Sequence, residues 1–414
     1  MTEARPASLK GGAFAVPAYR RYWGSQLVSG IGSWAQGLAQ AWLVLELTGA
    51  PVALGTVTML QFLPMLVFPL LGGVIADRWP RRRLLIATQV VALTQAVVLG
   101  LLVWSGAIQF WEVCVLAAVL GLSNAFGNPA QQALVPEIVG PELVGNAVAL
   151  NSVQFNVARI LGGGVGGAAV AILGIAPALF LNAASFVPAL VVLVLLRPAF
   201  AVPSRLTGRM VSQIGDGLRY ATADRSIRRT LALFGVVGLL GFNWTVAIPL
   251  LASSLNVGPA GYGAMSAGLG AGSLVSGLFL MRSRVPDERR LIAGAVGMGS
   301  MIVVLGLSSS FGVSLAVMVL AGLAGIMATV TANTRLQMLS SNEYRGRVMS
   351  MFVMLMGGTT PIGGFLLGAI AQAQGIHVGL VIFGSLVVIG IGAILFLDRG
   401  RPLAVAEPGP VPNR

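Results

Sequence analysis

Residues 54–83 read LGTVTMLQFLPMLVFPLLGGVIADRWPRRR, an almost wholly apolar stretch that ends in a cluster of arginines. About 20 apolar residues in a helix cross the hydrocarbon layer of a bilayer. Basic residues flank such a helix on its cytoplasmic side. The stretch therefore predicts a transmembrane helix over residues 54–76 whose C-terminal end reaches the cytoplasm.

The composition of the whole chain predicts the same environment. Of its 414 residues, 56% are hydrophobic and only 9% are charged, whereas a soluble domain carries roughly 25% charged residues. The net charge of +13 would also suit a nucleic-acid-binding protein, but the basic residues form short clusters between apolar runs. We therefore expect the lipid bilayer, and no nucleic acid, as a partner.

The apolar runs indicate how the chain is organised. Twelve of them are long enough to span a bilayer, and each should be helical because lipid cannot satisfy backbone polar groups. They are residues 22–47, 54–76, 84–104, 110–132, 147–173, 176–196, 230–253, 262–281, 291–308, 312–334, 348–371 and 376–397. We expect an N-terminal tail (1–21), a six-helix bundle (22–196), a linker (197–229), a second bundle (230–397) and a C-terminal tail (398–414).

The basic residues predict the orientation of the chain. Of the 26 lysines and arginines, all but Arg159 lie in the two tails or in every second connection between spans. Cytoplasmic segments carry this excess. We therefore expect a multi-pass protein of the cell membrane with both termini and the central linker in the cytoplasm.

A weak internal repeat indicates two related halves. Residues 141–146 (PELVGN) before the fifth span resemble residues 342–347 (NEYRGR) before the eleventh. At the same offset, the glycine pair 162–163 corresponds to the pair 363–364. Two six-helix halves in the same orientation would produce this pattern.

The connection after the second span carries a recognisable motif. It reads GGVIADRWPRRR and contains Gly73, Asp77, Arg78, Arg81 and Arg82. This motif resembles the signature loop of the major facilitator superfamily, which implies the major facilitator fold. An unpaired carboxylate at the membrane edge is costly, so Asp77 should pair with an arginine or a helix N-terminus and could latch two conformations. The alternative is that the arginines only set the topology.

Further stretches narrow the resemblance. LTGA (47–50), ARILG (158–162) and RGRVMS (345–350) are similar to the branch that contains enterobactin exporters and macrolide efflux proteins. This resemblance implies secondary efflux of small amphiphilic molecules, of drug or siderophore type, by alternating access with proton antiport. A facilitator or importer of a small metabolite, or a non-transporting sensor or assembly factor, remains an alternative.

Glycines mark the fifth span. Gly162, Gly163, Gly166 and Gly167 resemble the glycine-rich helix-5 motif of facilitator antiporters, although Gly163 stands where that motif has proline. Glycines allow close helix contact and permit a bend. The alternative is simple helix packing.

Polar residues inside the spans predict a central cavity, because such residues normally face an interior. The candidates are Gln36, Gln40, Asn124, Asn128, Gln131, Asn156, Arg159, Asn243, Trp244 and Asn333. Each amide could instead form an interhelical hydrogen bond. Arg159 is the strongest candidate for substrate binding or gating, since a buried cation costs at least about 2.5 kcal/mol; backbone carbonyls or amides are its alternative partners.

Few groups in the spans could carry a proton. Glu46 and Glu112 near the outer face are the candidates for proton coupling, and either could be an ordinary rim carboxylate. One histidine, one cysteine (Cys114) and no deep pair of carboxylates predict that the chain is not an enzyme, and we expect no metal and no cofactor. We expect a monomer that binds a small-molecule substrate and protons.

Overall fold

The computed structural model describes residues 9–67, 80–196, 218–281, 287–341 and 343–398. The described part folds into helices without strands. After a short 3-10 segment, η1 (Leu9–Ala15), the helices of the first part of the chain are α1 (Pro17–Thr48), α2 (Pro51–Val67), α4 (Arg81–Trp104), α5 (Phe110–Val139), η2 (Pro141–Leu143), α6 (Val144–Leu173) and α7 (Ile175–Leu195). Those of the second part are α9 (Arg225–Gly241), α10 (Trp244–Ser254), α11 (Gly258–Met281), α12 (Glu288–Leu307), α13 (Phe311–Leu339), α14 (Arg345–Val353), η3 (Met354–Gly358), α15 (Thr360–Gln374) and α16 (Ile376–Leu397).

The helices have the length and composition that a bilayer requires. Within the described residues, ten helical segments are long and apolar enough to cross a membrane, and α2 is a shorter apolar helix. Helix α1 has 32 residues but is less apolar than these segments, because its buried side chains include Gln26, Gln36 and Gln40. Each of the 12 predicted spans coincides wholly or partly with one of these helices.

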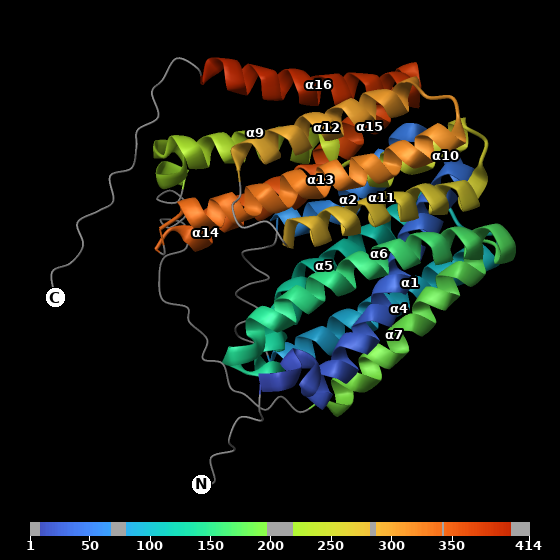
Figure 1. Ribbon diagram of the computed structural model, residues 1–414. Helices are drawn as coiled ribbons and strands as arrows, with labels where there is room; N and C mark the ends of the chain where they lie inside the picture. Colours follow the sequence, from blue (N-terminus) through green and yellow to red (C-terminus); the bar gives the residue numbers. More distant parts are fainter. Residues whose placement is uncertain (1–8, 68–79, 197–217, 282–286, 342, 399–414) are drawn as a thin grey trace, which may run out of the picture.

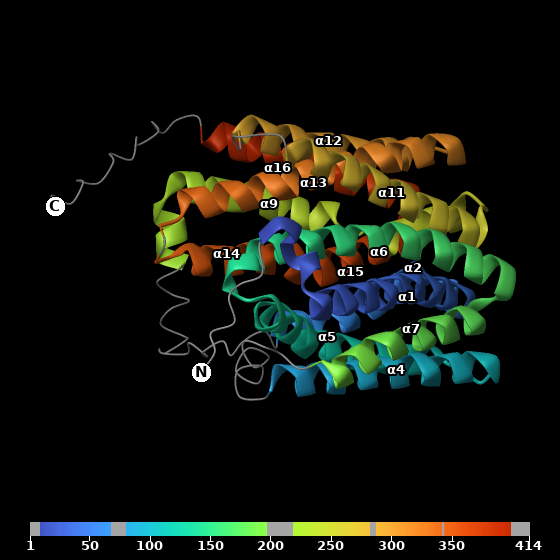
Figure 2. The ribbon, with the colours of Figure 1, turned by 60° about the horizontal axis from the view of Figure 1, so that its bottom comes forward.

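The helices are grouped into two halves (Figures 1 and 2). Helices α1, α2 and α4–α7 form the N-terminal half, and α9–α16 form the C-terminal half. The halves meet mainly where α6 packs on α11 and α2 packs on α15. We call the end of the molecule where α1, α4, α6, α9, α12 and α14 begin the basic end, and the opposite end the far end.

Glycines permit close contact between the halves. A Cβ atom on Gly167 of α6 would lie 2.7 Å from the Cα of Gly263 in α11. A Cβ on Gly55 of α2 would lie 2.8 Å from the Cα of Phe365 in α15. Both contacts involve the far-end portions of α6 and α2, so the closest approach of the halves is displaced toward the far end.

The apolar core has the same asymmetry. Among the described residues, one continuous cluster joins the C-terminal half to far-end residues of the N-terminal half such as Leu43, Leu54 and Val170. The basic-end residues of the N-terminal half, including Tyr19 and Leu134, form a separate cluster. The two halves therefore share a core at the far end but keep separate cores toward the basic end.

Two spans of the C-terminal half are interrupted at neighbouring places. The seventh span breaks between α9 and α10 at Phe242 and Asn243, and the eleventh contains the π-helical turn η3 between α14 and α15. A Cβ on Gly363 of α15 would lie 2.6 Å from Oδ1 of Asn243, so the two interrupted spans pack closely beside one break. Helix α6, in contrast, is continuous through its glycine motif.

Candidate functional site

One face of α6 changes from exposed to buried along the helix. At the basic end, Val148 and Phe155 are 55% and 56% exposed. Further along, Gly163 and Gly167 are buried against α11, and Val170 is only 6% exposed. The face that packs against the other half at the far end is thus open toward the basic end.

Arg159 lies where this change occurs, about halfway along α6. Gly162 and Gly166 contact α1, and Ile160 and Gly163 contact α11. At helical spacing, Arg159 falls between these two sets of positions, so it lies on the side of α6 that faces the centre of the molecule.

The contacts of Arg159 leave part of its charge unsatisfied. Its Nη2 donates to Oδ1 of Asn156 at 3.1 Å, and Nδ2 of Asn156 donates to the carbonyl of Ser152 at 2.9 Å. Its Nε is buried without a hydrogen-bond partner among the described residues. Neutral amides satisfy a guanidinium less well than an anion does, so this position can accept an acceptor-rich ligand.

Helix α1 also has exposed residues on the side that faces the centre of the molecule. Ser33 and Gly37 of α1 are exposed. On one side of them around the helix, Gly30 and Trp34 contact α6. On the other side, Gln40 contacts α2. A Cβ atom on Gly37 would meet nothing within 4 Å. Since Gly37 lies in the middle third of α1, the exposed surface reaches well into the span. We call the exposed positions Ser33 and Gly37 of α1 and Phe155 of α6, together with Arg159, the central opening.

The predicted polar residues of α5 are arranged along one side of that helix. Asn124, Asn128 and Gln131 are half-buried. They lie between Gly121, which contacts α2, and Ser123, whose hydroxyl donates to the Thr88 carbonyl of α4 at 2.9 Å. The polar residues predicted from the sequence therefore form a contiguous strip on α5.

Two predicted glutamines of α1 make hydrogen bonds inside the N-terminal half. Gln36 is 2% exposed; its Nε2 donates to Oε1 of Gln95 at 2.8 Å, and its Oε1 accepts from Nδ2 of Asn182 at 2.5 Å. Gln40 donates to Oε1 of Gln61 at 3.4 Å. These bonds tie α1 to α4, α7 and α2, so both amides act as interhelical links.

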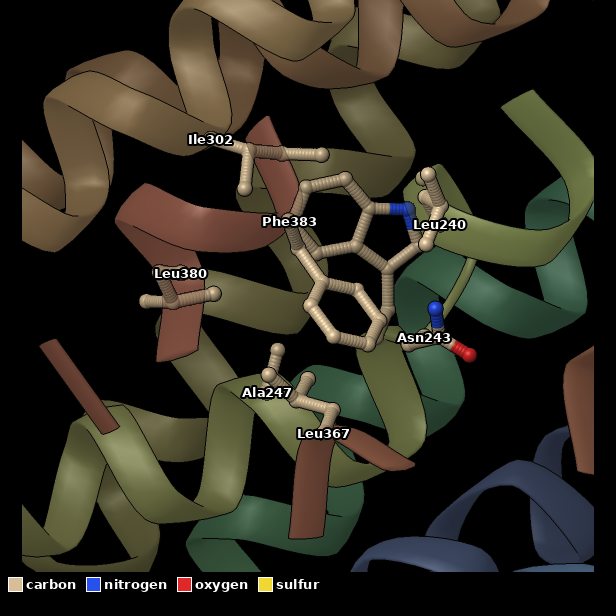
Figure 3. A pocket seen from close by; sticks show the side chains of 9 residues that line it. Leu240, Asn243, Ala247, Ile302, Leu367, Leu380 and Phe383 are labelled. Atoms are coloured by element: carbon tan, nitrogen blue, oxygen red, sulfur yellow. The ribbon is translucent and has the colours of Figure 1, made fainter. Parts of the chain in front are cut away.

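The predicted residues of the C-terminal half are dispersed. Asn243 and Trp244 line a small cavity inside that half, shown in Figure 3. Its volume of about 10 Å³ admits at most a single water. Asn333 is half-buried near the basic end of α13 and accepts from Nε2 of Gln337 at 2.6 Å. The structure brings none of these three side chains into contact with Arg159.

The glycine motif has two separate packing faces. A Cβ on Gly162 would lie 2.5 Å from Cβ of Trp34, and one on Gly166 would lie 2.7 Å from Cα of Ala35, both in α1. Gly163 and Gly167 face α11 instead. The motif therefore lets α6 contact its own half and the opposite half at the same level.

Part of the signature loop can be placed. Nη1 of Arg81 lies 2.6 Å from Oε1 of Glu137 in α5. Arg82 donates to the carbonyls of Leu193 and Val194 at the end of α7. Gly73, Asp77 and Arg78 lie outside the described residues, so the latch remains a prediction.

The two proton-coupling candidates lie at the far end. Oε1 of exposed Glu46 accepts from Nε1 of Trp42 at 2.8 Å. Glu112 accepts from the backbone N–H of Gln109 at 2.8 Å and so caps the start of α5. Their role in coupling remains a prediction. In the described part of the chain, no group of three or more histidine, cysteine or acidic side chains could hold a metal ion.

An ion-pair network at the basic end was not anticipated from the sequence. Glu288 at the start of α12 pairs with Arg335 of α13 at 3.0 Å and with Arg229 of α9 at 2.8 Å. Asp398 after α16 pairs with Arg225 at 3.1 Å and with Arg229 at 3.3 Å. The pair of Glu288 with Arg335 lies at the same junction of the C-terminal half as the pair of Arg81 with Glu137 does in the first half, with the charges exchanged. No signal in the sequence pointed to it, because these residues do not correspond at the offset of the glycine repeat.

Comparison with known proteins agrees with this architecture. The sequence matches the family described as transmembrane secretion effector over residues 12–403. It is 26% identical over 394 residues to the multidrug efflux pump Tap of Mycolicibacterium fortuitum, covering 92% of this chain and 96% of that protein. It is 25% identical to the staphyloferrin A transporter of Staphylococcus aureus, covering 93% and 98%, and 21% identical to macrolide efflux protein A of Streptococcus pyogenes, covering 88% and 92%.

Solved transporters have the same fold. A bacterial homologue of the human lysosomal transporter Spinster, in an inward-facing and unoccupied conformation, superposes with a TM-score of 0.70 at 14% identity, covering 92% of this chain and 96% of the other. The nucleoside transporter NupG superposes with a TM-score of 0.73 at 12% identity, covering 92% and 99%. The fold class predicted from the sequence, 12 spans in two parallel halves, is confirmed.

Proposed function

Because this chain belongs to the transmembrane secretion effector family of the major facilitator superfamily, we propose that it exports small amphiphilic organic molecules across the cell membrane by alternating access, driven by proton antiport. The export of drugs by relatives that span nearly the whole chain supports the direction of transport. The remaining steps of the proposal rest on the geometry of the two halves.

The observation that carries the proposal is the change of exposure along α6. Alternating access needs a central site that is open to one side while the halves close on the other. In α6, the face that carries Arg159 is exposed at Phe155 and buried at Gly163 and Gly167. A molecule entering from the basic end would therefore reach Arg159 and be stopped by the contact of α6 with α11.

The charge distribution supports an orientation. The arginines at the starts of α4 and α14 and before α9 lie at the basic end, and cytoplasmic ends of spans carry this excess. We therefore propose that the basic end is cytoplasmic and that the structure is open inward, the state in which an exporter takes up its cargo.

The lining of the opening supports an amphiphilic cargo. Trp34 and Phe155 form an edge-to-face aromatic pair with ring centroids 5.6 Å apart. Hydrogen-bonding groups lie nearby in sequence, at Ser33, Asn156 and Arg159. An aromatic wall next to a partly unsatisfied guanidinium suits an organic molecule with apolar surface and hydrogen-bond acceptors.

Transport into inverted membrane vesicles tests the proposal, because their cytoplasmic face points outward. A panel of macrolides, tetracyclines and cationic dyes is offered with and without an imposed pH gradient, acid inside. We expect gradient-driven accumulation of at least one compound by the wild-type protein and none by protein-free vesicles. Accumulation that is the same with and without the gradient would refute antiport and indicate a facilitator. If no compound accumulates, drug export is refuted.

Variants then test the residues. Arg159→Ala should lower kcat/KM by about 10-fold to 100-fold, because a charge-assisted hydrogen bond contributes about 1.5–3 kcal/mol, and Arg159→Lys should recover part of this. Glu46→Gln should uncouple accumulation from the gradient. Glu142→Gln, at an exposed basic-end position, is the matched control for loss of a carboxylate. Coupling that survives Glu46→Gln removes Glu46 as the carrier.

A further inference from the structure

Arg159 lies far from every carboxylate that the structure describes. It stands near the middle of α6, a helix of 30 residues. At 1.5 Å per residue, roughly 20 Å of helix separates it from either end. The described carboxylates lie within three residues of a helix end or between two helices, at one of the two ends of the molecule: Glu46, Glu112, Glu137, Glu142, Asp224, Asp287, Glu288, Glu343 and Asp398. None of them reaches the depth of Arg159.

Two arginines at the basic end show how the chain otherwise satisfies a partly buried guanidinium. The side chain of Arg81 is 12% exposed and pairs with Glu137 at 2.6 Å. The side chain of Arg335 is 14% exposed and pairs with Glu288 at 3.0 Å. Arg159 is also partly buried, but its described partner is a neutral amide at 3.1 Å. A cation is most costly near the centre of a bilayer, so the deepest guanidinium has the weakest of these partners.

Arg159 has N–H groups to spare for a carboxylate. A guanidinium has five N–H donors in a planar fork. One of them, on Nη2, donates to Oδ1 of Asn156, and Nε has no partner among the described residues. A carboxylate can accept two parallel bonds from such a fork, which makes its binding stronger and more specific than that of a neutral acceptor. Arg159 can therefore bind a carboxylate and keep its bond to Asn156.

An exposed aromatic ring lies one helical turn from Arg159. Phe155 precedes Arg159 by four residues, so the two side chains are neighbours on α6, with Cβ atoms roughly 6 Å apart. Phe155 is 56% exposed and packs edge to face against Trp34 of α1, with ring centroids 5.6 Å apart. A ring that lies against Phe155 would hold an acidic substituent toward Arg159. The spacing therefore suits an aromatic ring that carries its carboxylate directly.

We propose that the central opening binds an aromatic carboxylate, whose charge neutralises Arg159 and whose ring lies against Phe155. The other residues of the central opening, Ser33 and Gly37, carry no charge, so no acidic group there competes with the carboxylate for Arg159. A neutral or cationic compound would leave the guanidinium without a counter-charge. The proposal names the class of cargo, and therefore its transport, unlike its binding, rests on the proposed function.

Equilibrium dialysis tests the charge of the ligand. The purified full-length protein in a neutral detergent at neutral pH is dialysed against 2-naphthoate or its uncharged isostere 2-naphthamide, and binding to protein-free micelles is subtracted. We expect the wild-type protein to bind naphthoate about 10-fold to 100-fold more tightly than naphthamide, because hydrogen bonds to charged groups are the stronger ones.

Variants assign the preference to residues. Arg159→Gln should abolish it, and Arg159→Lys should retain part of it, because an ammonium keeps the charge but not the planar fork. Phe155→Leu should weaken binding of both compounds by a similar factor and leave the preference unchanged. Arg289→Gln, which removes an exposed arginine at the basic end, is the matched control and should bind both compounds as the wild type does.

Three results would overturn the proposal: equal affinity of the wild-type protein for the two compounds, a preference for naphthoate that survives Arg159→Gln, or displacement of naphthoate by chloride at the same concentration, which would assign the site to an inorganic anion. The comparison on the wild-type protein needs no variant, so it decides even if Arg159→Gln fails to fold. Dialysis also needs no gradient. Naphthoate binding that depends on Arg159 would therefore stand if export failed in vesicles, and drug export with equal binding of the two compounds would refute only the anionic cargo.

Discussion

Arg81 at the start of α4 and Glu137 near the end of α5 form an ion pair with 2.6 Å between Nη1 and Oε1. The C-terminal half repeats the pair with the charges exchanged, because Glu288 starts α12 and Arg335 lies near the end of α13, 3.0 Å apart. Both pairs join the third and fourth spans of their half at the basic end. Charge complementarity at this junction, rather than the sign of either residue, is what the two halves share.

Breaking the first pair should destabilise the N-terminal half. The two side chains are only 12% and 18% exposed, so Glu137→Gln leaves a largely buried guanidinium without its carboxylate partner, at a cost of about 1–3 kcal/mol. Thermal unfolding in detergent, followed by tryptophan fluorescence, measures the loss. The double variant Arg81→Glu, Glu137→Arg copies the arrangement of the other half and should recover most of it. If the double variant is no more stable than Glu137→Gln, the stability depends on which of the two positions carries the positive charge.

Enlarging a glycine at the contact between the halves should open the far end. A Cβ on Gly167 would meet the Cα of Gly263 at 2.7 Å, whereas one on Gly164 of the same helix would meet nothing within 4 Å. We expect Gly167→Ala to lengthen the distance between spin labels at the exposed far-end positions Ile172 and Leu307, measured by electron–electron resonance in a Cys114→Ala background. Gly164→Ala should leave the distance distribution unchanged, and identical distributions in both variants would contradict the closing role of this contact.

Filling the central opening should stop transport without unfolding the protein. Gly37 is exposed in the middle third of α1, and a Cβ atom there would meet no neighbour within 4 Å. Gly37→Leu therefore adds a side chain whose Cβ atom causes no clash. We expect an unchanged melting temperature and export reduced by about tenfold or more, because a misplaced substrate loses its productive geometry. Gly392→Leu places the same side chain at an exposed, equally unobstructed position of α16 and should export normally. Normal export by Gly37→Leu would show that the cargo does not pass this face of α1.

Replacing Gln36 distinguishes a structural from a cargo-binding amide. Gln36→Leu removes hydrogen bonds to Gln95 and Asn182 and leaves both partners buried. We expect a loss of about 1–2 kcal/mol in stability, with KM for exported compounds unchanged. Gln132→Leu, at an exposed position of α5, is the control for adding a leucine. A raised KM at unchanged stability would instead assign Gln36 to the cargo site.

The sequence predicted the spans and halves well because they depend on local properties. Apolar length defines a span wherever the solvent is lipid, and repeated glycines and basic clusters revealed the duplication. The depth of Arg159 could also be counted along its span. Which helix covers which residue could not be deduced: Gln36 and Gly37 are neighbours in sequence, yet one is buried against α4 and α7 and the other is exposed. Ion pairs such as that of Glu288 with Arg335 join residues 47 apart and depend on how the helix ends meet.

The placement of Arg159 halfway along α6 has an electrical consequence. Among the described lysines and arginines it alone lies away from the helix ends, so it stands within the field that a membrane voltage creates. When the protein changes from the inward-open to the outward-open form, the side of the membrane to which Arg159 is exposed changes as well. Moving one elementary charge across the whole membrane changes the free energy by about 2.3 kcal/mol per 100 mV. An inside-negative cell would thus bias the resting protein toward the inward-open form, and bound anionic cargo would cancel that bias.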